Sequence, residues 1–364
     1  MISKSNTNHS SKEDTKILPI IAVTSVVIKI ILAILLVMLG TGTIGLAIAV
    51  AFSQVLMGIL SGFAIMKIFK SGNYDKKHHE VGLTQASKTL LNSGLVFWIP
   101  VLITTIGTQL GTIVVFGSEG SNESAVYFMA ITIVTGLLSV IYALFTIALP
   151  ALSSMQDGRK RFTWQAIRFS GIISLPFSAS IIFYSKDLMQ LLGSSYAEGA
   201  LSLEILLFSI FPTIIFSGVN DLVHAYGKYR QVLAIGLATS IPRTVLYFIL
   251  IPVYGSAGAA MAYTIGSLAG MLVSIIISTK IGLQINWNHI SLMFIIPLAI
   301  AFLLSYLQIN YVIGIAFTLF VSYLILIGLK IFTKLDILFS LRLLPKGISN
   351  PLINFLFMIY RRLK

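Results

Sequence analysis

Long apolar runs are the feature that most limits what this chain can fold into. More than half of its residues (57%) are hydrophobic, and only 10% are charged. The runs are about 20 residues or longer, which is the length that an α-helix needs to cross the hydrocarbon core of a membrane. The sequence therefore predicts an all-α, polytopic transmembrane protein with about ten spans. The expected spans are residues 17–39, 43–66, 89–116, 125–149, 167–184, 200–219, 231–253, 256–279, 290–308 and 311–332.

Positive charge is concentrated in alternate loops. The formal net charge is +13, which in a soluble protein could indicate nucleic-acid binding. Here lysines and arginines follow the second, fourth, sixth and eighth expected spans and flank both ends of the spanning region. Cytoplasmic loops of membrane proteins carry this kind of excess. We therefore expect a multi-pass protein of the cell membrane with both termini in the cytoplasm and no nucleic-acid partner.

The sequence argues against several kinds of chemistry. It contains no cysteine (Cys 0), so thiolate nucleophiles, disulfides and cysteine-based metal sites are excluded. His78 and His79 have acidic neighbours, but Lys76 and Lys77 would repel a metal cation, so this segment is interpreted as a solvated loop. No Gly-rich phosphate loop or catalytic triad pattern is present. We expect no enzyme, no metal site and no cofactor, and leave a coupling cation or proton gradient open.

Two basic residues stand near the middle of expected spans. Lys29 lies in the first span and Arg243 in the seventh, with no acidic residue in the same membrane layer to pair with either. A basic side chain at the bilayer centre costs about 2.5 to 3.5 kcal/mol on insertion scales, so such residues are candidates for functional sites. Pro242 should bend the second of these helices and free a carbonyl, which requires cover by protein or a wet cavity. The helix face that bears Arg243 should therefore point inward.

An internal repeat surrounds these two residues. The segment TSVVIKIILAILLVMLGTGTIGLAIA (24–49) resembles TSIPRTVLYFILIPVYGSAGAAMA (239–262). The matched residues include Lys29 with Arg243, Gly42 with Gly255, and Gly45 with Gly258. Four expected spans separate the two matching hairpins, so the repeating unit has six helices. Parallel repeats of this kind are common in transporters, with the binding site between the halves.

The repeat divides the chain into parts and leaves one of them short. The expected parts are a cytoplasmic tail (1–16), the last hairpin of a first lobe (17–66), a cytoplasmic loop (67–88), a complete six-helix second lobe (89–279), two extra C-terminal helices (290–332) and a basic tail at the inner membrane surface (333–364). Four helices of the first lobe would be missing ahead of the chain. We therefore expect this hairpin to be covered by a second chain, by a second copy of this one, or by membrane lipids.

Three segments carry small-residue packing patterns that resemble those of a known family. They are ALPALSSM (148–155), LMQLLGSSYAEGALSLEIL (188–206) and VYGSAGAAMAYTIG (253–266). In this order and separation they resemble the Wzx-type polysaccharide-biosynthesis flippases of the multidrug, oligosaccharidyl-lipid and polysaccharide exporter superfamily. The resemblance implies a two-lobe exporter fold around a central cavity, here with the first lobe incomplete. It also implies flipping of a polyprenyl-diphosphate-linked oligosaccharide across the cytoplasmic membrane for cell-surface polysaccharide biosynthesis.

Lys29 and Arg243 are the candidate contacts for the diphosphate of such a substrate. A diphosphate must leave water to cross the membrane, and fixed cations in a central cavity would offset part of that cost. Arg243 could take two phosphate oxygens through its planar fork, whereas Lys29 would act as a point charge. The alternative for each is a structural role, such as bonding to carbonyls freed by a kink.

Four further residues near the sixth and seventh expected spans carry weaker signals. Lys228 and Arg230 could recruit the head group at the cytoplasmic entrance of the cavity, or act as ordinary positive-inside anchors. Asp221 and His224 could form a proton-linked or ion-linked gate, or belong to a capped or solvated helix end.

Three other functions remain open. Cation-coupled export of a small molecule occurs in the same superfamily, although positive charge in the cavity argues against a cationic cargo. A membrane enzyme that transfers glycans would need a carboxylate or histidine constellation facing a leaflet, often on a large outer loop, and the outer loops here are short. The chain could also be an inactive or split half-transporter.

Overall fold

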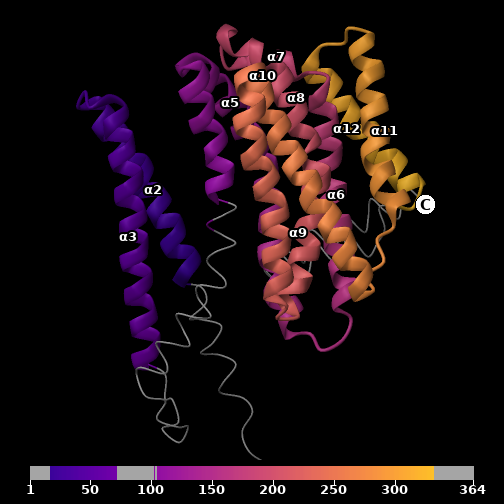
Figure 1. Cartoon of the computed structure of the whole chain (residues 1–364), viewed down its shortest axis with the longest axis horizontal. Helices are drawn as coiled ribbons and strands as arrows, with labels where there is room; N and C mark the ends of the chain where they lie inside the picture. Colours follow the sequence, from indigo (N-terminus) through magenta and orange to yellow (C-terminus); the bar gives the residue numbers. More distant parts are fainter. Residues whose placement is uncertain (1–16, 72–101, 103–104, 332–364) are drawn as a thin grey trace, which may run out of the picture. The chain divides into compact units, whose positions relative to one another are not determined.

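The computed structural model describes residues 17–71, 102 and 105–331, and every regular element in this part of the chain is helical (Figure 1). Residues 105–119 form one helix. The other elements are α2 (Ile17–Met38), α3 (Gly42–Ser71), α5 (Ser121–Ser154), α6 (Arg159–Ile182), α7 (Ser185–Leu191), the 3-10 helix η1 (Ser194–Gly199), α8 (Ala200–Phe208), α9 (Ile210–Ala225), α10 (Tyr229–Ile281), α11 (Trp287–Tyr306) and α12 (Tyr311–Gly328). They belong to two compact units, divided between Leu83 and Thr84. The expected tails, 1–16 and 333–364, and most of the loop 67–88 lie outside the described residues.

The described helices include 7 that are long and apolar enough to cross a membrane. One of them, α10, runs through two of the expected spans. A break at Gly255, where the backbone is not helical (φ 54°, ψ −132°), separates the two. The first expected span corresponds to α2, whose apolar stretch is Val27–Met38. The third, 89–116, lies largely outside the described residues. The prediction of a polytopic, all-α membrane protein is confirmed.

Several helices extend beyond the apolar runs that predicted them. The helix α3 continues to Ser71, although the expected span ends at residue 66. Likewise α6 begins at Arg159, eight residues before the expected 167, and α9 continues to Ala225. The backbone hydrogen bonds of a helix can continue in water, so the end of an apolar run marks the edge of the membrane layer and not the end of the helix.

The first unit contains the hairpin of α2 and α3, drawn in indigo to violet in Figure 1. Gly40 and Gly42 form its turn, with φ values of 79° and 53°. The hydroxyl of Thr41 donates a hydrogen bond to the carbonyl oxygen of Leu36 (2.6 Å). Gly255, the repeat partner of Gly42, has nearly the same φ (54°). The two matched glycines therefore adopt the left-handed region that a residue with a side chain rarely enters, which supports the repeat.

The second unit is built around one core of large aliphatic side chains. Within it, α10 packs on α8 and α9, while α5 packs on α6, α8 and α9. Fully buried members of this core include Leu138, Ile141, Ile167, Leu175 and Leu206. The helices α11 and α12 pack on α6 and on each other. Both follow the expected six-helix second lobe (89–279) in the sequence.

The break in α10 is stabilised by α5. Beyond Gly255, the backbone N–H of Ser256 donates a hydrogen bond to Glu123 Oε2 (3.2 Å). The hydroxyl of Ser202 on α8 donates to the hydroxyl of Ser256 (3.2 Å). A carboxylate at a helix N-terminus satisfies one of its free N–H groups and complements its dipole. Glu123 thus caps the second half of α10 from a neighbouring helix.

Candidate functional site

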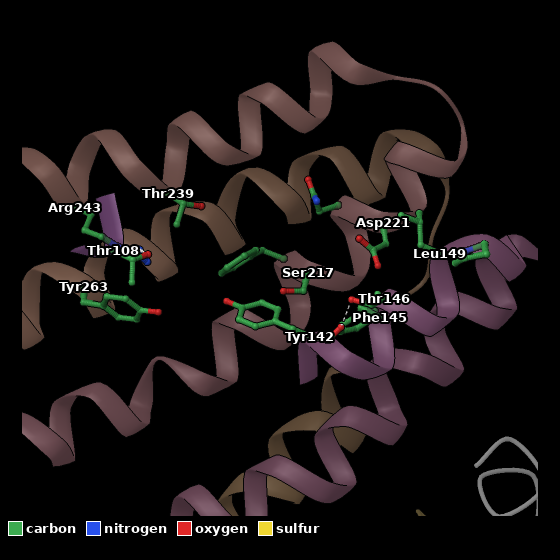
Figure 2. Close-up of a pocket in the computed structure, with 13 residues that line it drawn as sticks. Thr108, Tyr142, Phe145, Thr146, Leu149, Ser217, Asp221, Thr239, Arg243 and Tyr263 are labelled. Atoms are coloured by element: carbon green, nitrogen blue, oxygen red, sulfur yellow. Dashed lines mark hydrogen bonds between the residues drawn. The ribbon is translucent and has the colours of Figure 1, made fainter. Parts of the chain in front are cut away.

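A cavity of about 420 Å³ lies within the second unit, among the helix 105–119, α5, α9 and α10 (Figure 2). This volume falls in the range of small-molecule pockets, which is about 300–1,000 Å³. The cavity is lined by Thr108, Tyr142, Phe145, Thr146, Leu149, Pro150, Phe216, Ser217, Asn220, Asp221, Thr239, Arg243 and Tyr263. Two of these residues, Arg243 and Asp221, carry opposite charges, and Figure 2 shows them toward opposite ends of the group.

Arg243 is held at its end of the cavity by hydroxyl groups and one aromatic ring. Its side chain is buried, with 4% of its surface exposed. The guanidinium donates hydrogen bonds to Ser267 Oγ (3.1 Å) and Thr108 Oγ1 (3.4 Å). The guanidinium carbon lies 3.8 Å from the centroid of the Tyr263 ring, a cation–π arrangement. The inward orientation expected for Arg243 is therefore observed, but its contacts are hydroxyls and a ring rather than carbonyls freed by a kink.

The absence of a side chain at Gly266 makes room for the arginine. A Cβ atom at this position would lie 2.7 Å from Arg243 Cβ and 2.6 Å from the Thr239 carbonyl oxygen. The two halves of α10 fold back on each other after the break at Gly255, so the backbone of Gly266 directly contacts the first half. Glycine is the residue that permits such close approach.

The positive charge of Arg243 has no carboxylate partner among the described residues. Its contacts there are the two hydroxyls and the Tyr263 ring, and its buried Nε–H has no hydrogen-bond partner. An arginine has five N–H donors in a planar fork. A buried charge is costly unless it is paired. Arg243 therefore retains both charge and donor capacity for an anion.

Asp221 lines the other end of the same cavity. Its side chain is half-buried on α9, one residue after Asn220 and one helical turn after Ser217. Asp221 forms no ion pair with Arg243 in the described part of the chain. Figure 2 shows Tyr142 and Ser217 between the two charged side chains. The cavity thus presents a donor-rich cationic end and an acceptor-rich anionic end.

Comparison with known proteins places this fold in a family. Residues 2–200, more than half of the chain, match the family model described as polysaccharide biosynthesis protein. The chain belongs to this family. The fold is similar to that of the lipid II flippase MurJ in an inward closed conformation, with a TM-score of 0.62 at 17% sequence identity. The match covers 83% of this chain and 65% of that one. No match was found among curated protein sequences.

The other residues expected near the entrance of this polysaccharide biosynthesis protein do not line the cavity. His224 is half-buried on α9, with its ring 5.5 Å from the ring of Tyr229. Lys228 and Arg230 are exposed at the turn between α9 and α10. Of the proposed gate pair, the structure therefore brings only Asp221 into the cavity, and the roles of the other three stay predictions.

Lys29 is half-exposed on α2, in the first unit. It makes no ion pair with another described residue. The cavity that contains Arg243 belongs wholly to the second unit. A joint contact of Lys29 and Arg243 with one substrate therefore stays a prediction.

Sequence reasoning missed Arg159, which it treated as one of several loop cations. The guanidinium of Arg159 donates hydrogen bonds to the carbonyl oxygens of Met155 (2.6 Å), Ala225 (2.9 Å) and Ser153 (3.3 Å). These carbonyls lie at the C-terminal ends of α5 and α9. Its guanidinium carbon also lies 5.3 Å from the centroid of the Tyr226 ring. Arg159 therefore joins two helix ends, a role that the run of three basic residues (159–161) did not indicate.

Proposed function

We propose that this protein takes part in flipping a polyprenyl-diphosphate-linked oligosaccharide across the cytoplasmic membrane for cell-surface polysaccharide biosynthesis. The observation that carries the proposal is the buried guanidinium of Arg243, which faces a cavity within the membrane-spanning helices and has no carboxylate partner among the described residues. Membership of the polysaccharide biosynthesis family and the likeness to a lipid flippase fold support it. The flippase fold favours a transport protein over a membrane enzyme.

The chemistry of the substrate accounts for a buried arginine. A diphosphate loses its hydration when it enters the membrane, and a cation already buried there compensates part of the loss. The planar fork of arginine can donate two parallel hydrogen bonds to phosphate oxygens. Arg243 keeps its remaining Nη–H groups for this contact, since two hydroxyls and the Tyr263 ring are its partners in the described chain.

Lys29 is the second cation of the proposal. Its repeat position is equivalent to that of Arg243, and it stands near the middle of α2 without a charged partner among the described residues. A lysine in hydrocarbon is costly. We propose that a substrate phosphate, together with a second chain or a second copy of this chain, shields it. Both termini are proposed to lie in the cytoplasm.

Cation-coupled export of a small molecule is the second candidate function. Asp221 favours it, because a half-buried carboxylate facing a cavity can bind a proton or a metal cation. Arg243 in the same cavity opposes it, since it repels a cationic cargo. A proton or a cation coupled to glycan movement is compatible with both residues.

The test is translocation of a fluorescent polyprenyl-diphosphate oligosaccharide by the full chain in liposomes, followed with a membrane-impermeant quencher. Arg243→Ala should slow translocation, because removing one partner of a buried charge pair costs about 2 to 5 kcal/mol of substrate binding. Arg243→Lys should also slow translocation, because lysine makes a single point contact where arginine can make a bidentate one. Lys29→Ala should also slow translocation.

The matched control is Arg161→Ala, which removes an exposed arginine from the first turn of α6. Its translocation rate per molecule of reconstituted protein should equal that of the wild type. A normal rate for Arg243→Ala and Lys29→Ala would refute a substrate role for both cations. A lower amount of protein with a normal rate per molecule would assign them a structural role.

A further inference from the structure

The cavity is polar in two different ways at its two ends. The Arg243 end offers N–H donors, whereas the other end offers the carboxylate of Asp221, the amide of Asn220 and the hydroxyl of Ser217. These last three residues lie at positions i, i+3 and i+4 of α9 and therefore share one helix face. Figure 2 shows Asp221 and Ser217 on the cavity side of this helix. A ligand that fills the cavity must satisfy both ends.

The two charged side chains do not neutralise each other. The contacts of Arg243 with Ser267, Thr108 and the Tyr263 ring hold its guanidinium at its own end. Asp221, Asn220 and Ser217 have no hydrogen-bond partner for their side chains in the part of the chain that the structure describes. Polar groups that are partly removed from water need hydrogen-bond partners. The Asp221 end is therefore available to a ligand that carries donors.

An inorganic anion alone fits this cavity poorly. A phosphate held by Arg243 would face the negative charge of Asp221 across a space of low dielectric, where like charges repel strongly. A sugar ring between them would separate the charges and present hydroxyl donors to the carboxylate. Hydroxyls also accept hydrogen bonds, so they suit the amide of Asn220. The aromatic walls formed by Tyr142, Phe145 and Phe216 can cover the apolar faces of a ring.

We propose that the cavity of the second unit binds a glycosyl phosphate, with the phosphate on Arg243 and the ring hydroxyls of the attached sugar on Asp221, Asn220 and Ser217. This inference rests on the proposed function and adds a sugar-recognising subsite to it. The side chains at the Asp221 end would then select among glycans, whereas Arg243 would bind the part that all such substrates share.

The experiment compares three soluble probes on the purified full chain in nanodiscs: inorganic phosphate, glucose 1-phosphate and glucose. Calorimetric titration should show that glucose 1-phosphate binds on the order of tenfold more tightly than inorganic phosphate, as expected for hydrogen bonds to a charged group. Asp221→Asn should remove this preference. The same variant should bind inorganic phosphate as tightly as the wild type or more tightly, because the repelling charge is gone.

Two further variants separate this inference from the proposed function. Arg243→Gln should weaken the binding of both phosphate probes; if its phosphate binding is unchanged, the anion site of the proposed function is wrong. Asp157→Asn is the matched control, since Asp157 is exposed in the turn between α5 and α6, and it should bind all probes like the wild type. Thermal unfolding of each variant monitors folding.

Three outcomes would overturn the sugar subsite while leaving the anion site intact. The first is a wild type that binds glucose 1-phosphate no more tightly than inorganic phosphate. The second is an Asp221→Asn variant that loses affinity for both probes in parallel, which indicates a structural role. The third is an Asp221→Asn variant that keeps the preference but loses proton- or cation-dependent transport, which assigns Asp221 to coupling.

Discussion

At the scale of residues, the arginine site shows how a membrane helix can hold a charge without cancelling it. Ser267 and Thr108 accept hydrogen bonds from Arg243, and Tyr263 covers one face of its guanidinium. Hydroxyls and rings orient the cation but carry no net charge. The guanidinium is therefore positioned before an anion arrives, which reduces the cost of ordering it on binding.

Gly266 is the residue on which this arrangement depends sterically. Gly266→Ala should destabilise the protein by about 1 to 3 kcal/mol, because a methyl group would collide with Arg243 Cβ and the Thr239 carbonyl oxygen. Thermal unfolding in detergent measures the effect. Gly136→Ala is the control, since nothing lies within 4 Å of a Cβ atom at that exposed position of α5. Equal unfolding temperatures for the two variants would contradict the close approach inferred at Gly266.

At the scale of elements, two side chains fasten the ends of the helices that enclose the cavity. Glu123 on α5 accepts a hydrogen bond from the first N–H of the second half of α10. At the opposite end of α5, Arg159 donates to carbonyls that end α5 and α9. Both bonds link a charged side chain to the favourable end of a helix dipole. The walls of the cavity are thus joined by polar contacts as well as by apolar packing.

Arg159→Ala should loosen the joined ends of α5 and α9. The expected loss of stability is about 1 to 3 kcal/mol, since three carbonyls lose a charged donor. Limited proteolysis at the turn 155–158 and thermal unfolding measure it. Arg161→Ala removes an exposed arginine two residues away and should change neither. If both variants were cut and unfolded alike, the role assigned to Arg159 would be wrong.

At the scale of the whole molecule, the charge pattern predicts which loops face the cytoplasm. Ser121, Ser194 and Asp157 are exposed positions outside the expected spans, and the chain contains no cysteine (Cys 0) that would react in the background. Single cysteines at Ser121 and Ser194 should be labelled by an impermeant maleimide added to intact cells. A cysteine at Asp157 should be labelled only after the cells are opened. Labelling of Asp157→Cys in sealed cells would reverse the topology.

Association of the chain is a second prediction at this scale. Lys29 on α2 needs cover within the membrane, because a charged side chain that faces hydrocarbon is costly. Native mass spectrometry after gentle extraction should therefore detect a second copy or another chain. A strictly monomeric particle that still flips lipid-linked glycan in liposomes would refute this prediction.

The sequence by itself determined the fold class and the approximate positions of the membrane spans. Apolar runs located the spans because the bilayer imposes one length on every helix that crosses it. The matched glycines Gly42 and Gly255 were found as repeat positions from the sequence, and they share a backbone region that only glycine enters readily. The unpaired Arg243 indicated a buried site because its charge is costly in hydrocarbon.

Only the tertiary structure decided which side chains share a cavity with that arginine. Thr108, Asp221 and Thr239 come from three different helices, and nothing in their local sequence marks the face that each presents to the cavity. In a soluble protein the polar face of a helix points to water and reveals its rotation. In a membrane, the faces toward lipid and toward neighbouring helices are both apolar, so rotation is set by close packing at small residues such as Gly266. The composition of the cavity therefore follows from how the helices pack.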